Sequence, residues 1–231
     1  MPITMSQYWL QLDDLSKTVV FCLILMSLTS WFIIFSRAWR FWRVRKSAPA
    51  QALFWDAPSF EEAVNLLSLS DVENIYLPLA QKSIAAVNAH GNSNRRMGKT
   101  QLPEILTRVL RQELNRVIVK LESGLTVLAS IGATAPFVGL LGTVWGIYHA
   151  LTAVSGANAI QIEVVAGPVG EALVMTGLGL MVAIPAVLAY NALNRINRIT
   201  FSELDGFAFD LHAHWSANAL ATNSAIVKPT E

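Results

Sequence analysis

Three polar side chains lie in two long apolar runs of this sequence and are the residues best suited to do chemistry. Thr143 lies in the run 125–150, Thr176 lies in the run 171–194, and Glu171 stands at the leading edge of the second run. A carboxylate at membrane depth is costly unless it faces water, a partner or another helix, so its default interpretation is functional. The sequence therefore predicts that these groups line or border a polar path through an apolar wall.

Each of the three residues also has a simpler interpretation. Threonine hydroxyls in helices often donate only to the carbonyl one turn earlier, which would leave Thr143 and Thr176 without a special role. Pro168 and Gly170 precede Glu171 and indicate a helix start, and acidic residues are favoured in a first turn. The residues alone leave both interpretations open.

The two runs are each roughly 25 residues long, and about 20 apolar residues suffice for a helix that crosses a bilayer. Small residues recur in both runs at steps of three and four, so they share one stripe of each helix. The stripes contain Gly132, Ala135, Gly139, Gly142 and Gly146 in the first run and Gly179, Ala183 and Ala186 in the second. Small residues permit close packing of helices in lipid, so we expect a tightly packed hairpin, although ordinary polytopic membrane proteins have such stripes too.

A third apolar run, residues 18–36, has no charged residue and predicts a further membrane span. The expected fold class is therefore an all-α integral membrane protein with three transmembrane helices. Pro136 and Pro185 lie inside the second and third spans and are expected to kink or loosen them. The single cysteine, Cys22, excludes an intramolecular disulfide.

The composition agrees with a membrane protein and argues against several other classes. Only 14% of the residues are charged and 53% are hydrophobic, whereas a soluble domain has about 25% charged residues. A net charge of +1 provides no strongly basic domain for nucleic acid. His212 and His214 lack nearby groups that would complete a metal site, and no phosphate-binding loop or nucleophilic triad is recognisable. We expect no enzyme, no metal and no cofactor.

The basic residues predict the orientation of the chain. Of the 17 Lys and Arg residues, thirteen lie between Arg37 and Lys120 and none lies between the second and third spans. Positive charge near span ends remains on the cytoplasmic side. The expected order is a periplasmic amphipathic segment 1–17, a span 18–36, a cytoplasmic helical domain 37–124, a span 125–150, a periplasmic link 151–170, a span 171–194, and a cytoplasmic helix and tail 195–231.

The segment 37–124 has the pattern of packed helices. Ser59 is placed to cap a helix over FEEAVNLL. From Pro103, apolar positions continue at helical spacing into the second span, which predicts one unbroken helix about 70 Å long that extends into the cytoplasm. Its basic residues form either a solvated face or a charged vestibule below a pore. These residues are Arg108, Arg111, Arg116 and Lys120.

Two blocks of the hairpin resemble a known family. GLLGTVWGIYHAL at 139–151 and VAGPVGEALVMTGLGLMVAIPAVLAYN at 165–191 are similar to the core of the ExbB/TolQ/MotA family of proton-channel motor subunits, and most similar to ExbB. The two blocks are specific because they occur together, in this order and at this distance. One departure is Ala166-Gly167-Pro168, where the family more often has Ala-Pro-Gly or Ala-Pro-Ala before the acidic residue.

The resemblance implies an assembly and a role. One hairpin cannot enclose a pore, whereas several copies in a ring can, and the family implies a pentamer around a dimer of a single-span ExbD-like partner with a protonatable aspartate. Thr143 and Thr176 would then line the proton path, and Glu171 would orient or gate it near the outer end. A TonB-like protein would carry the energy from the bacterial inner membrane to outer-membrane transport. A TolQ-like role in envelope integrity and a passive membrane scaffold remain alternatives.

Overall fold

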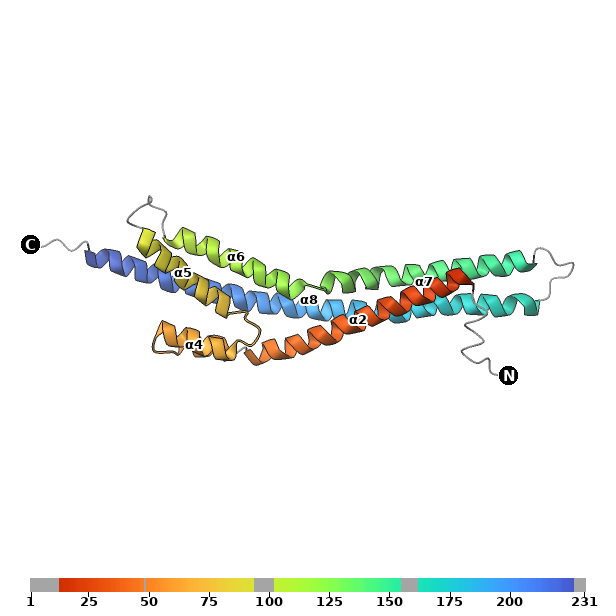
Figure 1. Ribbon diagram of the computed structural model, residues 1–231, viewed down its shortest axis with the longest axis horizontal. Helices are drawn as coiled ribbons and strands as arrows, with labels where there is room; N and C mark the ends of the chain where they lie inside the picture. The colour runs from red at the N-terminus through yellow and green to blue at the C-terminus, as the bar shows by residue number, and fades with distance from the viewer. Residues whose placement is uncertain (1–12, 48, 94–101, 155–161, 227–231) are drawn as a thin grey trace, which may run out of the picture. The chain divides into compact units, whose positions relative to one another are not determined.

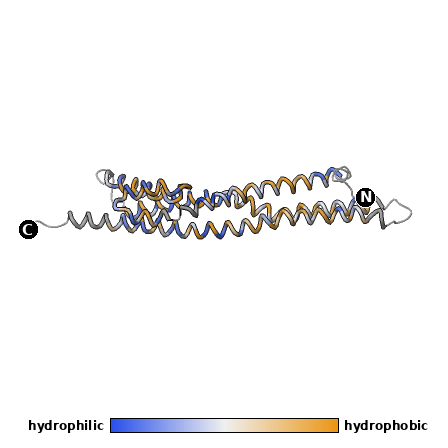
Figure 2. Tube along the Cα trace, turned by 90° about the horizontal axis from the view of Figure 1, so that it is seen from below, coloured by the Kyte–Doolittle hydropathy of each residue, from blue (hydrophilic) through white to orange (hydrophobic). Residues whose placement is uncertain are grey.

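The computed structural model describes residues 13–47, 49–93, 102–154 and 162–226, and the secondary-structure elements in these ranges are all α-helices (Figure 1). The helices are α2 (Asp14–Ser47), α3 (Pro49–Trp55), α4 (Phe60–Ser70), α5 (Leu77–Ser93), α6 (Leu102–Glu122), α7 (Leu125–Val154) and α8 (Ile162–Ile226). Within these ranges, three stretches are long and apolar enough to cross a membrane, namely Asp14–Arg43, Leu102–Thr152 and Ala166–Ala217. Figure 2 shows long hydrophobic stretches along these helices. This architecture agrees with the expected all-α class with three apolar helices.

The chain forms two compact units, each with contributions from α2 and α8. The apolar unit comprises Met1–Arg37 and Gly124–Asn194, and the polar unit comprises Ala38–Ser123 and Arg195–Glu231. The apolar unit therefore contains the first part of α2, all of α7 and the first part of α8. The polar unit contains α3 to α6 and the two remaining helix ends.

In the apolar unit, α2 packs against α7 and α8 through a thin core. Val19 and Leu23 of α2 are buried against Ala135 of α7 and Ala183 of α8. Large apolar side chains such as Phe137 instead lie mostly exposed on the outer faces of the helices. A helix that is apolar all round is typical of a membrane span, because lipid covers the exposed apolar side chains.

The polar unit has a larger core that is centred on Phe207 of α8. The Phe207 ring lies edge-on to Phe54 of α3, with 5.1 Å between ring centroids, and to Tyr76, with 5.4 Å. Leu67 of α4 and Leu79 of α5 are fully buried in the same cluster. Aromatic pairs in this geometry stabilise a fold beyond the area that they bury, so five helices share one core in this unit.

Two polar residues organise the turns of the polar unit. Ser59 accepts a hydrogen bond from the Glu62 backbone N–H at 3.3 Å, which confirms the predicted helix cap. Asp71 is buried, and its Oδ2 accepts hydrogen bonds from the backbone N–H groups of Tyr76 (2.7 Å) and Leu77 (2.9 Å) at the start of α5. Burial, together with the nearby Glu203 and Asp71 carboxylates, raises the pKa of Tyr76 to about 12.

The prediction of one unbroken helix from the polar segment into the second span is wrong. Helix α6 ends at Glu122 and α7 begins at Leu125, with a turn at Ser123 and Gly124 between them. Gly124 has a φ of 84°, which a helix cannot include and which glycine adopts without a steric cost. The apolar spacing continues across this turn, so periodicity alone gave no sign of the break.

The expected helix start just before Glu171 is also wrong. Helix α8 begins at Ile162 and includes Pro168, so Glu171 is the tenth residue of the helix rather than part of its first turn. Proline within a helix costs one backbone hydrogen bond but does not have to end it, especially in membrane helices. At its other end α8 extends to Ile226, so the helix expected in the segment 195–231 takes up most of that segment.

The left-handed residue between α6 and α7 generates the first testable prediction. A β-carbon at Gly124 would meet Ile33 at 3.5 Å, an ordinary contact, so the cost of Gly124→Ala is the backbone strain of about 1 kcal/mol. We expect the thermal midpoint of the purified protein to fall by a few degrees. Gly91→Ala is the control, because a β-carbon there meets nothing within 4 Å. An equal effect of the two substitutions would contradict the role assigned to Gly124.

Candidate functional site

The backbones of α7 and α8 approach each other closely where Gly139 faces Gly179. A β-carbon built on Gly139 would lie 2.7 Å from the Met175 carbonyl oxygen and 3.1 Å from the Gly179 α-carbon. A β-carbon on Gly179 would lie 2.7 Å from the Ala135 carbonyl oxygen. These neighbours are backbone atoms that cannot rotate away, so only glycine permits this separation of the two helices.

Other small residues extend this contact along both helices, and we call the whole contact the small-residue seam. A β-carbon on Gly146 would lie 2.9 Å from the Ala172 β-carbon, and one on Gly132 would lie 2.5 Å from Val187. At Gly142 it would meet both Met175 of α8 and Val19 of α2. The alanines of the seam are buried at the same contacts: Ala135, Ala172, Ala183 and Ala186.

The seam brings two hydroxyl groups into direct contact. Thr143 of α7 is buried, and its Oγ1 forms a short hydrogen bond with the Thr176 Oγ1 of α8. The same Thr143 oxygen lies 3.1 Å from the Ala172 carbonyl oxygen and 3.2 Å from the Gly139 carbonyl oxygen. Thr143 therefore does more than bond to its own helix, because it links α7 to α8.

The number of available protons fixes how this pair can be arranged. A hydroxyl has one proton to donate and two lone pairs to accept with. If Thr143 donates to the Ala172 or Gly139 carbonyl, the Thr143–Thr176 contact needs the Thr176 proton, and Thr176 keeps acceptor capacity for a further group. If Thr143 donates to Thr176, Thr176 can donate outward. The pair can thus present either an acceptor or a donor, depending on which way its protons point.

Glu171 lies close in sequence but does not join this hydroxyl pair. It is half-buried, and its carboxylate forms no hydrogen bond or ion pair with the residues that the structure describes. By helical spacing Glu171 shares a stripe with Met175, Leu178 and Val182, two of which pack against the Val19 and Leu23 cluster. Thr176 lies on the neighbouring stripe, so the three predicted polar residues do not form one contact.

The remaining predicted residues are the two prolines within the spans and the basic residues of α6. Pro136 and Pro185 lie inside α7 and α8, where each removes a backbone donor to the carbonyl one turn earlier. The four basic residues of α6 are all exposed, namely Arg108, Arg111, Arg116 and Lys120. Arg116 pairs with Glu113, and Lys120 donates to the Glu73 carbonyl at 2.8 Å. Glu113 is buried, so Arg116 and Lys120 also make contacts within the polar unit, and the solvated-face and vestibule interpretations of the four residues both stay predictions.

Sequence reasoning missed two features of the site. The Ala172 carbonyl accepts from Thr143, although its position four residues before Thr176 on the same stripe was a usable signal. Trp145, two residues after Thr143 in α7, has a buried indole N–H without a hydrogen-bond partner among the described residues, and its ring lies 5.0 Å from that of His149. No sequence pattern would have indicated the missing partner.

Comparison with known proteins identifies the class to which this hairpin belongs. A model of the MotA/TolQ/ExbB proton channel family matches residues 79–205, which is more than half of the chain. The chain belongs to the MotA/TolQ/ExbB family. This membership confirms the resemblance found in the two sequence blocks, and with three membrane-competent helices it makes the chain a multi-pass protein of the inner membrane. Members of this family are proton-channel subunits rather than enzymes.

Curated relatives carry the names of two systems. The chain is 42% identical over 202 residues to the biopolymer transport protein ExbB of Xanthomonas campestris pv. campestris, with 85% of this chain and 80% of the relative covered. It is 40% identical over 206 residues to ExbB of Neisseria meningitidis, with 87% and 91% covered. It is 34% identical over 196 residues to the Tol-Pal system protein TolQ of Haemophilus influenzae, with 79% and 81% covered.

The small-residue seam predicts opposite changes in stability when alanine replaces two different glycines of the hairpin. Gly139→Ala would push a β-carbon onto backbone atoms of α8, and such overpacking costs about 1–3 kcal/mol. Gly177→Ala adds a β-carbon with nothing within 4 Å, and replacing an open helical glycine by alanine gains about 0.5–1 kcal/mol. Thermal unfolding of the purified protein in detergent should therefore lower the midpoint for the first variant only. A seam that tolerates Gly139→Ala would contradict this packing.

Proposed function

We propose that this chain is a subunit of a ring-shaped proton channel that energises TonB-dependent transport across the outer membrane. The observation that carries the proposal is the Thr143–Thr176 hydroxyl pair, held by glycines between two otherwise apolar membrane helices. Membership of a proton channel family supports the proton as the transported ion, and the ExbB relatives at 40–42% identity support a role in TonB-dependent transport.

The hydroxyl pair suits an acid that alternates between two protonation states. A neutral carboxylic acid can donate its proton to Thr176, whereas a carboxylate needs a donor, and reversal of the two hydroxyls provides one. A carboxyl group in a low-dielectric lumen has a raised pKa, so it can take up a proton at one side and release it at the other. We place this acid on a single-span, ExbD-like partner, whose aspartate the family resemblance implies.

A ring of several copies is needed because a single hairpin does not enclose a lumen. The hairpin has no lumen of its own, but α7 and α8 leave broad exposed apolar faces, with Phe137 and Met181 as examples. Identical subunits that meet head to tail close into a ring, and the family resemblance implies five copies around two partner helices. One charge moved through 100 mV releases about 2.3 kcal/mol, so a few protons per event could supply useful work to a TonB-like protein.

The distribution of basic residues gives the proposed orientation. The N-terminus and the link between α7 and α8 lie in the periplasm, and the polar unit and the C-terminus lie in the cytoplasm. Glu171 is then near the periplasmic end of the path, where it orients or gates the partner. Its half-buried position is compatible with either the lumen or a contact between subunits.

A TolQ-like role is the second candidate, because one TolQ relative is more similar to this chain than one of the ExbB relatives is. TolQ of Haemophilus influenzae is 34% identical to this chain, whereas ExbB of Salmonella typhimurium is 31% identical over 184 residues. Sequence identity therefore does not separate the two systems by itself. A TolQ-like subunit would use the same kind of motor, so the partner that remains bound after purification distinguishes the two systems.

Removal of the hydroxyls provides the test of the proposed path. Thr143→Val and Thr176→Val keep the volume of the side chain but remove its polar atom, and Glu171→Ala removes the carboxylate. We expect TonB-dependent uptake by cells to fall at least tenfold in each of the three variants. Thr134→Val is the matched control, since the exposed Thr134 hydroxyl donates to the Ser130 carbonyl of its own helix and has no further partner among the described residues, and uptake by this variant should remain normal.

Native mass spectrometry of the same variants separates transport from assembly. The proposal expects about five copies of the chain with two copies of a small single-span acidic partner, for the wild type and for all variants. Normal uptake in the absence of all three polar groups would favour the passive scaffold. A monomer or dimer without such a partner would rule out the ring.

A further inference from the structure

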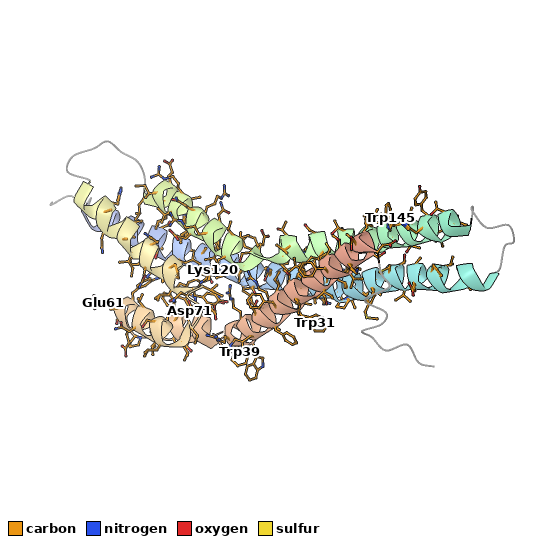
Figure 3. The ribbon with its side chains drawn as sticks, turned by 45° about the vertical axis from the view of Figure 1, so that its right-hand side comes forward. Trp31, Trp39, Glu61, Asp71, Lys120 and Trp145 are labelled. Carbon is orange, nitrogen blue, oxygen red and sulfur yellow. The ribbon has the colours of Figure 1, made fainter. Side chains whose placement is uncertain are left out.

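A basic and aromatic surface lies on α2 directly after its apolar stretch. Trp39 and Trp42 are 63% and 62% exposed, and Figure 3 shows Trp39 standing away from the helix. The side chains of Arg40 and Arg43 are 41% and 51% exposed. The Arg43 guanidinium carbon lies 6.0 Å from the centre of the Trp39 ring. We call these four residues, all within the polar unit, the α2 basic surface.

The carboxylate of Glu73, in the same unit, faces both arginines. Arg40 Nε lies 3.9 Å from Glu73 Oε2, and Arg43 Nη1 lies 3.9 Å from Glu73 Oε1. At these distances the charges attract, but the contacts are too long to be hydrogen bonds. The Glu73 carboxylate is therefore an anion that already lies against both guanidinium groups.

The chemistry of this surface fits one kind of ligand. Arginine presents a planar fork of donors that matches a phosphate group, and tryptophan is favoured at the level of lipid headgroups. The surface follows the uncharged run 18–36, so it lies at the boundary between hydrocarbon and water. We propose that the α2 basic surface binds the phosphate headgroup of an anionic phospholipid and that Glu73 is the internal anion that this phosphate displaces.

The position of Glu73 would connect lipid binding to the fold of the polar unit. Glu73 belongs to the short segment between α4 and α5, in which buried Asp71 fixes the backbone of Tyr76 and Leu77. The Glu73 carbonyl oxygen also accepts a hydrogen bond from Lys120 of α6. A phosphate on Arg40 and Arg43 would release the Glu73 side chain from α2 while this backbone frame remains in place. Anionic lipid would thereby loosen the contact between α2 and the α4–α5 turn.

The proposal predicts opposite effects for two sets of substitutions. The full-length protein is purified in detergent, incubated with equal amounts of phosphatidylglycerol and phosphatidylcholine, and the retained lipid is counted by native mass spectrometry. Each basic residue near an anionic surface is worth about 1 kcal/mol, or about fivefold in binding. Arg40→Gln with Arg43→Gln should lower the retained ratio of phosphatidylglycerol to phosphatidylcholine by at least fivefold. Glu73→Gln should raise it, because the competing anion is gone.

Matched substitutions separate local binding from a general change in charge. Arg108→Gln with Arg111→Gln removes two exposed arginines of α6, and Glu104→Gln removes an exposed carboxylate of the same helix; both should leave the lipid ratio unchanged. Arg40→Lys with Arg43→Lys keeps the charge that orients α2 but removes the guanidinium forks, and it should lower the ratio to a smaller extent.

Three results would overturn the proposal. Equal lipid ratios in the α2 variants and the α6 controls would show that no local headgroup site exists. An equal loss of both lipids would show that the surface contacts acyl chains only. Unchanged lipid ratios together with loss of a co-purified acidic protein would assign the surface to a protein partner instead.

Discussion

The contact between the backbones of Gly139 and Gly179 is the constraint on which the rest of the apolar unit depends. Lipid offers apolar side chains the same surroundings as a protein core, so helices associate in a membrane through close packing and hydrogen bonds rather than through the hydrophobic effect. Only at this separation can the Thr143 hydroxyl reach both Thr176 and the Ala172 carbonyl of the facing helix. A bulkier residue in the seam would therefore disturb the packing and the polar pair together.

The polar unit is held by a different balance of interactions. Its core is built from large apolar and aromatic side chains around Phe207, and the turn between α4 and α5 is held by the buried carboxylate of Asp71. Burial of a carboxylate is costly unless hydrogen bonds compensate it, and two backbone N–H groups do so on one oxygen. The chain thus combines a thin, backbone-determined contact in one unit with an ordinary protein core in the other.

Residue spacing predicted much of this structure because the relevant forces are periodic. The stripes of small residues and the three apolar runs follow from helical geometry, and Ser59 was recognisable as a helix cap. The break at Gly124 was not predicted because the apolar pattern continues through it. The inclusion of Pro168 in α8 was not predicted because one lost hydrogen bond does not have to end a helix. The placement of Glu171 apart from the hydroxyl pair depends on the exact start and register of α8. The role of Asp71 depends on contacts that no short motif encodes.

The central claim is that the hydroxyl pair serves an acid that another protein supplies. Proton flux into liposomes under an imposed membrane potential tests this most directly, with the chain reconstituted alone and together with its co-purified single-span partner. The account predicts flux only when both are present, and predicts its loss when Thr176→Val replaces the wild-type chain. Equal flux from the chain alone, or unchanged flux in the Thr176→Val complex, would contradict it.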